Sequence, residues 1–377
     1  MPRAHELTTK RTIVRATPIA VTPRVVQLRG LFDIPPEKRS EQRWTAHLPI
    51  DERPWAIGLI VGPSGAGKST VAREIFGAHV VSGFEWPRQK SVVDGFPATL
   101  GLKEITGLLS AVGFSSPPAW LRPFDVLSTG EQFRVTLARA LAETSDLVVV
   151  DEFTSVVDRT VAQIGSAAVA KAVRRAGRQF IAVTCHYDVE AWLQPDWVFQ
   201  PHLGRFQWRE LQRRPAVAIT ITRTTRDAWS AFAPHHYLSG DLHRSARCYL
   251  ASWGDRPVAF VAVLPSMGRR GVWREHRVVC LPDFQGIGIG LRVSEAIGSL
   301  VRAIGGQYTS TTSHPGFIAA RRRSGNWRMT QAPTINGKHS VGYIAANWRY
   351  CATFRYCGPP APDIRAARAL WDVPAVS

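Results

Sequence analysis

A glycine-rich run at residues 62–70 combines the residue types and the spacing that bind phosphate. It lies between an apolar stretch expected to form a strand and a segment expected to form a helix. Its residues are Gly62, Pro63, Ser64, Gly65, Ala66, Gly67, Lys68, Ser69 and Thr70. Glycines let backbone N–H groups close around phosphate oxygens, and a helix N-terminus adds positive charge. Lys68 would reach the β- and γ-phosphates and Ser69 would ligate Mg²⁺, so the run predicts an ATP site.

Two adjacent carboxylates follow a second apolar stretch, Leu147 to Val150. A strand that ends near a phosphate loop can place both acids beside the bound triphosphate. Asp151 would then hold Mg²⁺ through water, and Glu152 would polarise the attacking water as general base. The pair predicts ATP hydrolysis in addition to ATP binding.

Three further segments occur in the order found in ABC-type ATPases. Residues 127–132 read LSTGEQ and resemble the ABC signature, residues 155–158 resemble the D-loop, and His186 follows an expected strand as a switch histidine does. The resemblance implies that Ser128 and Gly130 contact the γ-phosphate held by a partner subunit. It also implies a head-to-tail homodimer with two sandwiched ATP molecules, in which Asp158 lies in the D-loop and His186 senses the γ-phosphate.

The match departs from transporter ATPases in two respects. Glu131 stands where transporters usually have glutamine, which is closer to SMC-type and DNA-repair ABC ATPases. About 60 residues separate Lys68 from Ser128, leaving little room for the helical subdomain that couples transporters to membrane partners. These departures argue against a transporter. Two assignments stay open: the Q-loop residue is Gln89 or Asp94, and the adenine-stacking residue is Phe32 or Trp44.

A second glycine-rich run, residues 285–290, follows an expected strand and precedes an expected amphipathic helix. Its residues are Gln285, Gly286, Ile287, Gly288, Ile289 and Gly290. The run resembles motif A of the GNAT acyltransferases, which implies backbone N–H groups that bind the pyrophosphate of acetyl-CoA or another acyl-CoA. The alternative is a tight strand-to-helix turn that binds no ligand.

The same resemblance suggests catalytic residues for an acyl transfer. Glu275, on the strand before the loop, is the nearest carboxylate that could deprotonate an amine. His236, in the pair His235-His236, is a second candidate base because histidine titrates near neutral pH. Alternatively, that pair marks a helix end. Candidates for protonating the leaving thiolate are Tyr308, Ser310 and Ser313.

The net charge of +18 is concentrated in the C-terminal half. Residues 1–50 carry +5, residues 51–200 carry −2 and residues 201–377 carry +15. Such a field attracts polyanions, so nucleic acid is an expected partner. The stretch 327–355 interleaves aromatic and basic residues, and three arginines occupy positions 321–323, as base stacking and phosphate neutralisation would require. Arginine-rich codon usage and tryptophans that fill a β core are the alternatives.

Expected strands and helices alternate through residues 51–205. The residues after them form short β-rich runs around one expected helix. Together these patterns predict a fold of the α/β class. We predict a basic segment at 1–50 that completes the ATPase and contains a strand from Arg24 to Leu28. An ABC-type ATPase domain at 51–205, a mixed α+β GNAT-like domain at 215–360 and a tail at 361–377 follow. Apolar runs are too short for a membrane span and no signal peptide is evident, so a cytoplasmic protein that binds no membrane is expected.

Taken whole, the sequence resembles a fusion of an ABC-type ATPase to a predicted GNAT acetyltransferase. We therefore predict an ATPase coupled to an acyl-CoA-dependent N-acyltransferase that acts on or near nucleic acid. One alternative is a DNA base-modifying enzyme of the GNAT fold, similar to phage Mom. Another is a non-catalytic, nucleic-acid-binding ABC ATPase of the DNA-repair type.

Overall fold

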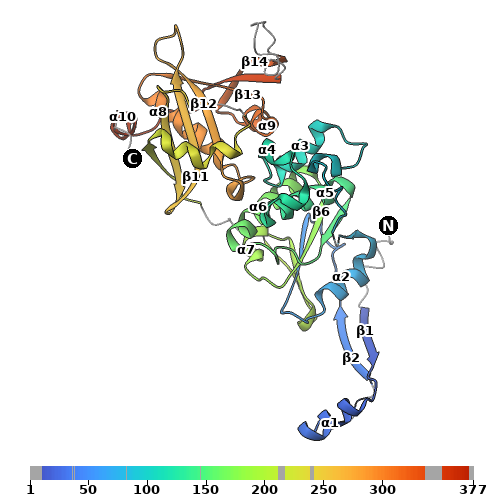
Figure 1. The fold of residues 1–377 in the computed structure, drawn as a ribbon. Coiled ribbons are helices and arrows are strands. Elements are labelled where there is room, and N and C mark those ends of the chain that lie inside the picture. Colours follow the sequence, from blue (N-terminus) through green and yellow to red (C-terminus); the bar gives the residue numbers. More distant parts are fainter. Residues whose placement is uncertain are drawn as a thin grey trace. The chain divides into compact units, whose positions relative to one another are not determined.

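A computed structural model describes residues 11–35, 37, 39–81, 83–144, 146–210, 217–237, 242–335 and 350–372. The chain divides into two compact units that interleave along the sequence (Figure 1). Unit 1 comprises Met1–Gly83, Thr144–Ser155 and Val173–Arg213. Unit 2 comprises Phe84–Glu143, Val156–Ala172 and Arg214–Ser377. The segments around the signature and the D-loop therefore pack with the basic C-terminal residues.

Unit 1 is built on a six-stranded sheet in the order β4-β5-β6-β3-β7-β8. Neighbouring strands are parallel except for β7 and β8, which are antiparallel. The strands are β3 (Ile57–Val61), β4 (Val80–Val81), β5 (Leu147–Val150), β6 (Gln179–Thr184), β7 (Trp197–Gln200) and β8 (Arg205–Trp208). The helical elements are α2 (Lys68–Phe76), η2 (Gly77–His79), α7 (Val189–Leu193) and η5 (Pro201–Leu203). All of β3 is buried, as a central strand covered on both faces should be.

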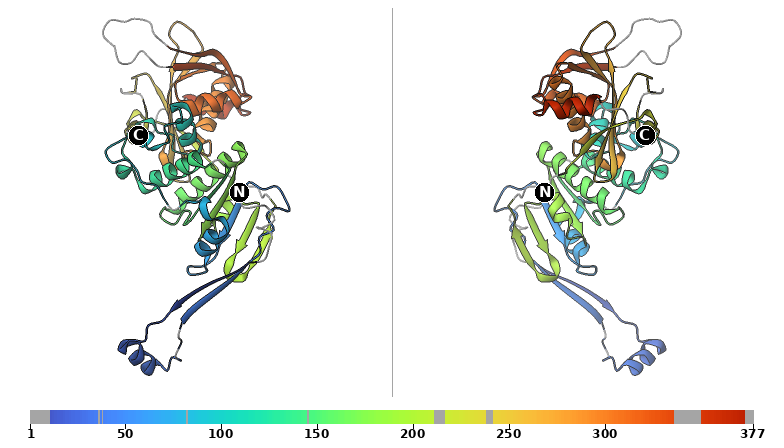
Figure 2. Two further views of the ribbon diagram at one scale, coloured as in Figure 1. Left: turned by 90° about the vertical axis from the view of Figure 1, so that its right-hand side faces the viewer. Right: turned by 90° about the vertical axis from the view of Figure 1, so that its left-hand side faces the viewer.

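A two-stranded ribbon of β1 (Arg11–Pro18) and β2 (Arg39–Ala46) extends from this sheet and carries α1 (Pro23–Phe32) at its tip (Figure 2). The predicted strand from Arg24 to Leu28 is wrong, since these residues belong to α1. The Thr22 side chain accepts a hydrogen bond from the Val25 N–H, and Pro23 occupies the first turn. These start signals outweigh the β preference of the two valines.

The helices of unit 2 that precede its sheet surround the signature. They are η3 (Val92–Gly95), α3 (Leu102–Ala111), α4 (Pro117–Trp120), η4 (Phe124–Val126), α5 (Thr129–Glu143) and α6 (Arg159–Ala176), whose last turn lies in unit 1. Before the signature, the short segment predicted to leave little room for a transporter's helical subdomain contains α3 and the four-residue α4. Leu109, on α3, is fully buried.

The C-terminal part of unit 2 is built on a seven-stranded sheet in the order β14-β15-β13-β12-β11-β10-β9. Its strands are β9 (Thr220–Thr224), β10 (Arg247–Trp253), β11 (Arg256–Pro265), β12 (Val272–Cys280), β13 (Gln307–Thr312), β14 (Trp327–Ile335) and β15 (Tyr350–Tyr356). Its helical elements are η6 (Arg226–Ala231), η7 (Ala233–His235), η8 (Pro282–Phe284), α8 (Ile289–Ala303), α9 (Pro315–Arg323) and α10 (Ile364–Asp372). Neighbours are antiparallel except β12 and β13, which α8 connects as a parallel pair.

Two apolar clusters cover the two faces of this sheet. Side chains of α8 and α10, including Val293 and Trp371, pack with Tyr249 and Val261 on one face. Side chains around η6, such as Trp229, pack with other strand residues in a second cluster. The fold is thus α/β, as predicted. Within the described residues, no helix combines the length and the apolarity needed to cross a membrane.

Candidate functional site

The glycine-rich run forms the turn between β3 and α2, as predicted. Gly65 and Gly67 have φ values of +77° and +79°, a backbone region that favours glycine. Helix α2 begins at Lys68, whose Nζ donates to the Pro63 carbonyl at 2.8 Å. The lysine ammonium and the N-terminus of α2 therefore lie at one loop, where an anionic phosphate would be stabilised.

The proposed metal ligands lie next to each other. The Ser69 hydroxyl donates to Oδ1 of Asp151 at 2.8 Å, and Arg73 forms an ion pair with Oδ2 at 3.3 Å. A hydroxyl oxygen beside a carboxylate is a donor set that fits Mg²⁺. Ser69 lies in the first turn of α2 and Asp151 follows β5, so the sheet itself brings the two residues together.

Glu152 and His186 follow two adjacent parallel strands. Glu152 has φ +52°, an uncommon conformation for a non-glycine residue and one that concentrates at functional sites. The His186 N–H donates to Oγ1 of Thr184, the last residue of β6, at 3.2 Å. In the order β5-β6-β3, these residues and the glycine-rich loop follow the carboxyl ends of three neighbouring strands, which is where ligands bind in open parallel sheets.

Trp44 is structural. Its indole ring atoms lie from 2.2 Å to 2.7 Å from the point that a Cβ on Gly67 would occupy, and the residue is 9 % exposed. The ring therefore supports the phosphate loop and offers no free face to an adenine. Phe32, the other adenine candidate, lies at the end of α1 and is 69 % exposed.

The signature begins helix α5 through a reciprocal cap. The Ser128 N–H donates to the Glu131 carboxylate at 2.9 Å, and the Glu131 N–H donates to the Ser128 hydroxyl at 3.3 Å. This is a capping box, so Glu131 has a structural reason to differ from the glutamine of transporters. Asp158 similarly caps α6 by accepting from the N–H groups of Thr160 and Val161.

The second glycine-rich run, residues 285–290, lies between η8 and α8, as predicted. Gly286 and Gly288 have φ values of +95° and +100°, and Gly288 is the N-cap of α8. A Cβ on Gly288 would meet, among the described residues, just the Lys171 ammonium at 3.9 Å, so space is open there. A Cβ on Gly290 would instead lie 3.2 Å from Phe317, so this glycine permits close packing between α8 and α9.

The side chain and the backbone N–H of Gln285 form hydrogen bonds to other residues of the protein. Its side-chain oxygen accepts from the Ser115 N–H at 2.6 Å, and its amide nitrogen donates to the Cys280 carbonyl at 2.7 Å. Its own N–H donates to the Pro282 carbonyl at 3.2 Å. These contacts fix the start of the loop and leave ligand contacts to residues 286–290.

The parallel strands β12 and β13 separate beside this loop. They pair only from Val272 to Arg274 and from Gln307 to Thr309. Beyond these residues β12 stays paired with β11, and β13 stays paired with β15. Among the described strands, none pairs with the β13-facing edge of β12 from Glu275 to Cys280. An extended ligand that carries amide groups could therefore add to this edge as a strand does.

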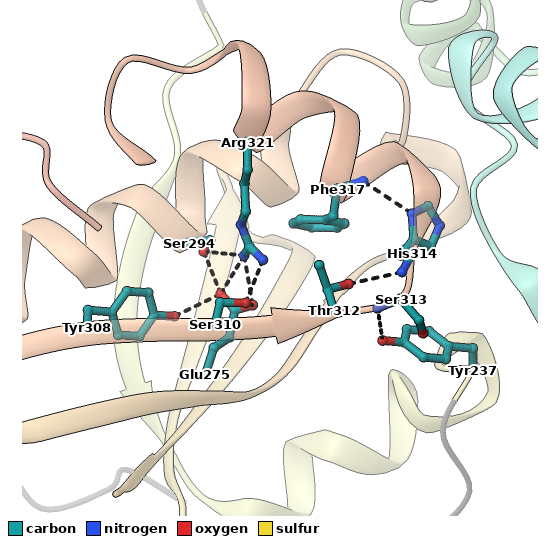
Figure 3. Close-up of polar contacts among 10 residues, drawn as sticks. All are labelled: Tyr237, Glu275, Ser294, Tyr308, Ser310, Thr312, Ser313, His314, Phe317 and Arg321. Carbon is teal, nitrogen blue, oxygen red and sulfur yellow. Dashed lines mark hydrogen bonds and ion pairs between the residues drawn. The ribbon is translucent and has the colours of Figure 1, made fainter. Parts of the chain in front are cut away.

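Glu275 lies within a buried polar cluster between β12, β13, α8 and α9 (Figure 3). The fully buried Arg321 forms an ion pair with it at 2.8 Å, and Tyr308 donates to it at 2.9 Å. Ser294 and Ser310 donate further hydrogen bonds to the carboxylate. Both carboxylate oxygens are thus committed to protein donors.

These contacts remove the geometric support for Glu275 as general base. Burial acts to raise the pKa of Glu275, but the Arg321 charge and the serine hydrogen bonds outweigh it and hold that pKa below its ordinary value. A carboxylate with a lowered pKa accepts protons weakly. The Tyr308 and Ser310 hydroxyls are held in the same cluster, which leaves neither of them free to protonate a thiolate.

Three histidines of unit 2, His235, His236 and His314, lie in partly or wholly buried positions. The His236 ring stacks on the Tyr237 ring with centroids 4.9 Å apart, and the neighbouring His235 is the last residue of the short helix η7. His314 is the N-cap of α9: its Nδ1 accepts from the Gly316 N–H at 3.1 Å, so Nε2 carries the proton and bonds the Ser115 carbonyl at 2.9 Å. The sequence argument missed His314 because nothing local marks a histidine as a cap.

Two members of the proposed stacking surface, Arg321 and Trp327, are buried, whereas Arg322, Arg323 and Arg328 are exposed. Trp327 is 7 % exposed and packs on Tyr356, while Arg321 stacks on the Trp327 ring at 4.4 Å. Trp327 thus fills the β core, as the alternative interpretation held, and Arg321 is buried beside it. Lys338, Trp348 and Arg349 lie outside the described residues.

Sequence comparison assigns the family. No protein-family profile matches the chain. Over 189 residues the chain is 32 % identical to the aliphatic sulfonates import ATP-binding protein SsuB 2 of Paracoccus denitrificans, a match that covers 45 % of this chain and 74 % of that protein. The chain belongs to the ABC-type ATP-binding proteins.

A second relative of this ABC ATPase is the Fe(3+) ions import ATP-binding protein FbpC 2 of Rhodococcus jostii. The two are 34 % identical over 186 residues, which covers 40 % of this chain and 53 % of the relative. The chain thus spans about half the length of that relative. Both relatives are named as import proteins, although the sequence argued against a transporter.

Two solved structures align with parts of this chain. CbiO1 from Clostridium perfringens, part of the ABC transporter complex cbiONQ, is 19 % identical with a TM-score of 0.34, covering 40 % of this chain and 75 % of that chain. A Bacillus subtilis acetyltransferase in complex with CoA is 14 % identical with a TM-score of 0.30, covering 37 % of this chain and 97 % of that chain. TM-scores below 0.5 are too low to establish a shared fold.

We expect Glu131→Ala to lower the free energy of unfolding of the ABC ATPase by about 1 kcal/mol, because the Ser128 N–H loses its partner. Glu131→Gln keeps an acceptor oxygen and should cost less. Glu143→Ala is the control at the other end of α5, since its exposed ion pair with Arg139 should contribute little. Urea unfolding of the three variants measures the effect. Equal losses for Glu131→Ala and Glu143→Ala would exclude the cap as the cause.

The stability of unit 2 should fall as the pH falls below about 6.5, the ordinary histidine pKa. Burial, followed by Arg277 and Arg274, lowers the pKa of His276 to about 4, and burial lowers the pKa of His314. Both histidines are neutral in the folded state. Their contribution to the free energy of unfolding is therefore complete above the unfolded-state pKa and is lost as the pH falls toward 4. His276→Asn should make this decline shallower in urea titrations at pH 7, 6 and 5. An unchanged decline would contradict the assignment.

Proposed function

We propose that this ABC ATPase binds and hydrolyses ATP in a head-to-tail homodimer. Asp151 and Ser69 would hold Mg²⁺, which supplies charge neutralisation at the phosphates. Glu152 would accept the proton of the attacking water, and His186 would contact the γ-phosphate. Ser128 and Gly130 would complete the site of the partner subunit. The support is the convergence of the phosphate loop, Glu152 and His186 on one end of the parallel sheet.

We further propose that the C-terminal sheet of unit 2 transfers an acyl group from acyl-CoA to an amine. The observation that carries this proposal is the glycine loop at 285–290 beside the separated strands β12 and β13. The open backbone at Gly288, the N-terminus of α8 and the Lys171 ammonium would favour a pyrophosphate. The unpaired edge of β12 would bind the amide groups of the pantetheine arm.

The acyl transfer needs two proton movements. The amine nitrogen attacks the thioester carbonyl carbon, the carbon–sulfur bond breaks, a base accepts the ammonium proton, and the thiolate receives a proton as free CoA leaves. Because Glu275 is committed to Arg321, His236 is the stronger of the two candidate bases. Ser313, whose side chain lies outside the Glu275 cluster, remains a proposed proton donor (Figure 3).

Nucleic acid is the proposed environment of the acceptor. The support is the +15 charge of residues 201–377, which would attract a polyanion through phosphate contacts. Binding of a duplex should therefore weaken steeply as salt rises. A polyanion that binds independently of salt concentration would argue for another role of these arginines.

One experiment tests the acyltransferase proposal directly. Isothermal titration of the full chain with acetyl-CoA should give saturable binding, and incubation with radiolabelled acetyl-CoA should transfer label to a polyamine, a protein or a nucleic acid. Mass analysis of nucleosides from cells with and without the gene identifies a base-modifying enzyme similar to phage Mom. Acetyl-CoA binding without any transfer would favour the non-catalytic nucleic-acid-binding alternative. Absence of acetyl-CoA binding would overturn the proposal.

The ATPase subunit of an importer is a second candidate, because the relatives are named import ATP-binding proteins. In such proteins helices between the phosphate loop and the signature would contact a membrane partner. Here α3 and α4 lie in that segment and pack within unit 2 against the C-terminal elements. Co-purification of an integral membrane protein with the full chain, lost in a chain lacking residues 84–126, would favour the importer.

A further inference from the structure

The start of the proposed acyl-CoA loop is held by the helix that begins with the ABC signature. Arg134, two turns into α5, is fully buried. Its guanidinium donates to the carbonyls of Pro282 and of Asp283, the latter at 2.9 Å. These two residues open η8 and lead directly into the 285–290 loop. A side chain from the signature helix thus bonds the backbone immediately before the loop.

The connection between α3 and α4 holds the next part of the loop. The Ser115 N–H donates to the Gln285 side chain at 2.6 Å. Gly113 has φ +90°, and a Cβ there would lie 2.7 Å from the Gln285 carbonyl oxygen. A Cβ on Gly286 would lie 2.8 Å from the Cβ of Ala168, on α6. The backbone of the loop is therefore in close contact with the helices on both sides of the signature.

The signature glycine lies at the same contact. The point that a Cβ on Gly130 would occupy is 3.8 Å from a carboxylate oxygen of Asp283. The residues proposed to meet the partner's γ-phosphate and the residues that begin the acyl-CoA loop are thus separated by one layer of atoms. A buried guanidinium that loses its hydrogen-bond partners is strongly destabilising, so a movement of α5 should carry η8 with it.

We propose that Arg134 is a positioning residue that couples the nucleotide state of the ABC signature to the affinity of the 285–290 loop for acyl-CoA. The inference rests on the proposed function of both sites. Closure of the ATP sandwich on Ser128 and Gly130 biases α5, and Arg134 transmits that bias to η8 and to the loop. Because coupling is reciprocal, acyl-CoA changes the affinity for ATP by the same factor.

The test measures the acetyl-CoA dissociation constant of the full chain by isothermal titration, with and without the ATP analogue AMP-PNP and Mg²⁺. AMP-PNP should change this constant by at least about fivefold, the lower end of typical allosteric couplings. Arg134→Met should abolish the change. Arg139→Met, on the same helix but bonded to Glu143 and to the Glu85 carbonyl, is the matched control and should retain it. Lys68→Ala controls for nucleotide binding.

A second readout does not need acetyl-CoA. Hydrogen exchange of the amides at 283–291 should change when AMP-PNP binds, and Arg134→Met should remove this change while Arg139→Met preserves it. If acetyl-CoA does not bind at all, the acyltransferase proposal fails, yet this exchange still decides the coupling. If acetyl-CoA binds but AMP-PNP alters neither the dissociation constant nor the exchange, the coupling is wrong and the acyltransferase proposal stands.

Two further variants guard against loss of folding in Arg134→Met. Arg134→Lys keeps the charge with fewer donors and should restore part of the coupling. Gly113→Ala leaves Arg134 intact but pushes a methyl group toward the Gln285 carbonyl, so it should weaken the coupling from the other side of the loop. Full coupling in a folded Gly113→Ala protein together with full coupling in Arg134→Met would overturn the role of this contact.

Discussion

Glu152→Gln should lower the rate of ATP hydrolysis by about 10²- to 10⁴-fold while leaving ATP binding intact. The range is that of a positioned general base, and an amide cannot accept the proton of the attacking water. Glutamine has nearly the same size as glutamate, so the backbone at φ +52° should be kept. Phosphate release measures turnover, and filter binding of labelled ATP measures occupancy.

Unhydrolysed ATP should also trap the homodimer, which size-exclusion chromatography with ATP and Mg²⁺ would detect as a doubled mass. Glu74→Gln is the matched control, because Glu74 lies on α2 in the same unit and pairs with the exposed Arg15. The control should hydrolyse ATP at the unaltered rate. Ordinary turnover in Glu152→Gln would remove that residue from the mechanism.

Gly288→Trp should weaken acetyl-CoA binding by at least about 100-fold, or about 2.7 kcal/mol, and leave ATP hydrolysis unchanged. The indole would fill the open space at the N-terminus of α8, where the pyrophosphate is proposed to bind. The substitution also forces a side chain into φ +100°, which adds strain. Isothermal titration of the full chain with acetyl-CoA gives the affinity.

Gly305→Trp separates the two effects. Gly305 follows the other end of α8 with φ +85°, and a Cβ there would meet no atom within 4 Å among the described residues. Tryptophan at position 305 imposes similar backbone strain, but at the end of α8 that is far from the 285–290 loop. Acetyl-CoA should therefore bind this control as it binds the natural sequence. Equal weakening in both variants would show that strain, and not occupancy of the loop, causes the loss.

The expected results for the ATPase and for the acyl-CoA loop are separable because the residues concerned lie in different units. Glu152 and Lys68 belong to unit 1, whereas Gly288 and Arg134 belong to unit 2. A defect in one reaction with the other intact would identify the affected site. A defect in both from a change at Arg134 alone would report the coupling itself.

Much of the nucleotide site could be predicted from the sequence because its signals are local. A strand, a glycine-rich turn and a helix follow one another within residues 57–76, and the strand before Asp151 is equally short. The amphipathic helix predicted to follow the second glycine-rich run forms as Ile289–Ala303 for the same reason. Local signals failed at α1, where the Thr22 cap and Pro23 decided the helix against two β-branched residues.

In unit 2 the sequence identified candidate catalytic residues by their residue type, but it did not predict their surroundings in the folded chain. In the sequence, Glu275 is a candidate general base. Only in the folded chain does Arg321, 46 positions away, pair with its carboxylate. His314 reads as an ordinary polar residue, and only the start of α9 turns it into a cap. A pKa depends on burial and on neighbours, which are properties of packing.

The sequence by itself determined that the chain contains an ATPase and a second glycine-rich loop, because each motif consists of consecutive residues. The tertiary structure decided how the second loop is held. Arg134 reaches Asp283 across 149 positions, and Ser115 reaches Gln285 across 170 positions. No periodicity or spacing encodes such contacts, since they arise when the signature helices pack against the C-terminal sheet in one compact unit.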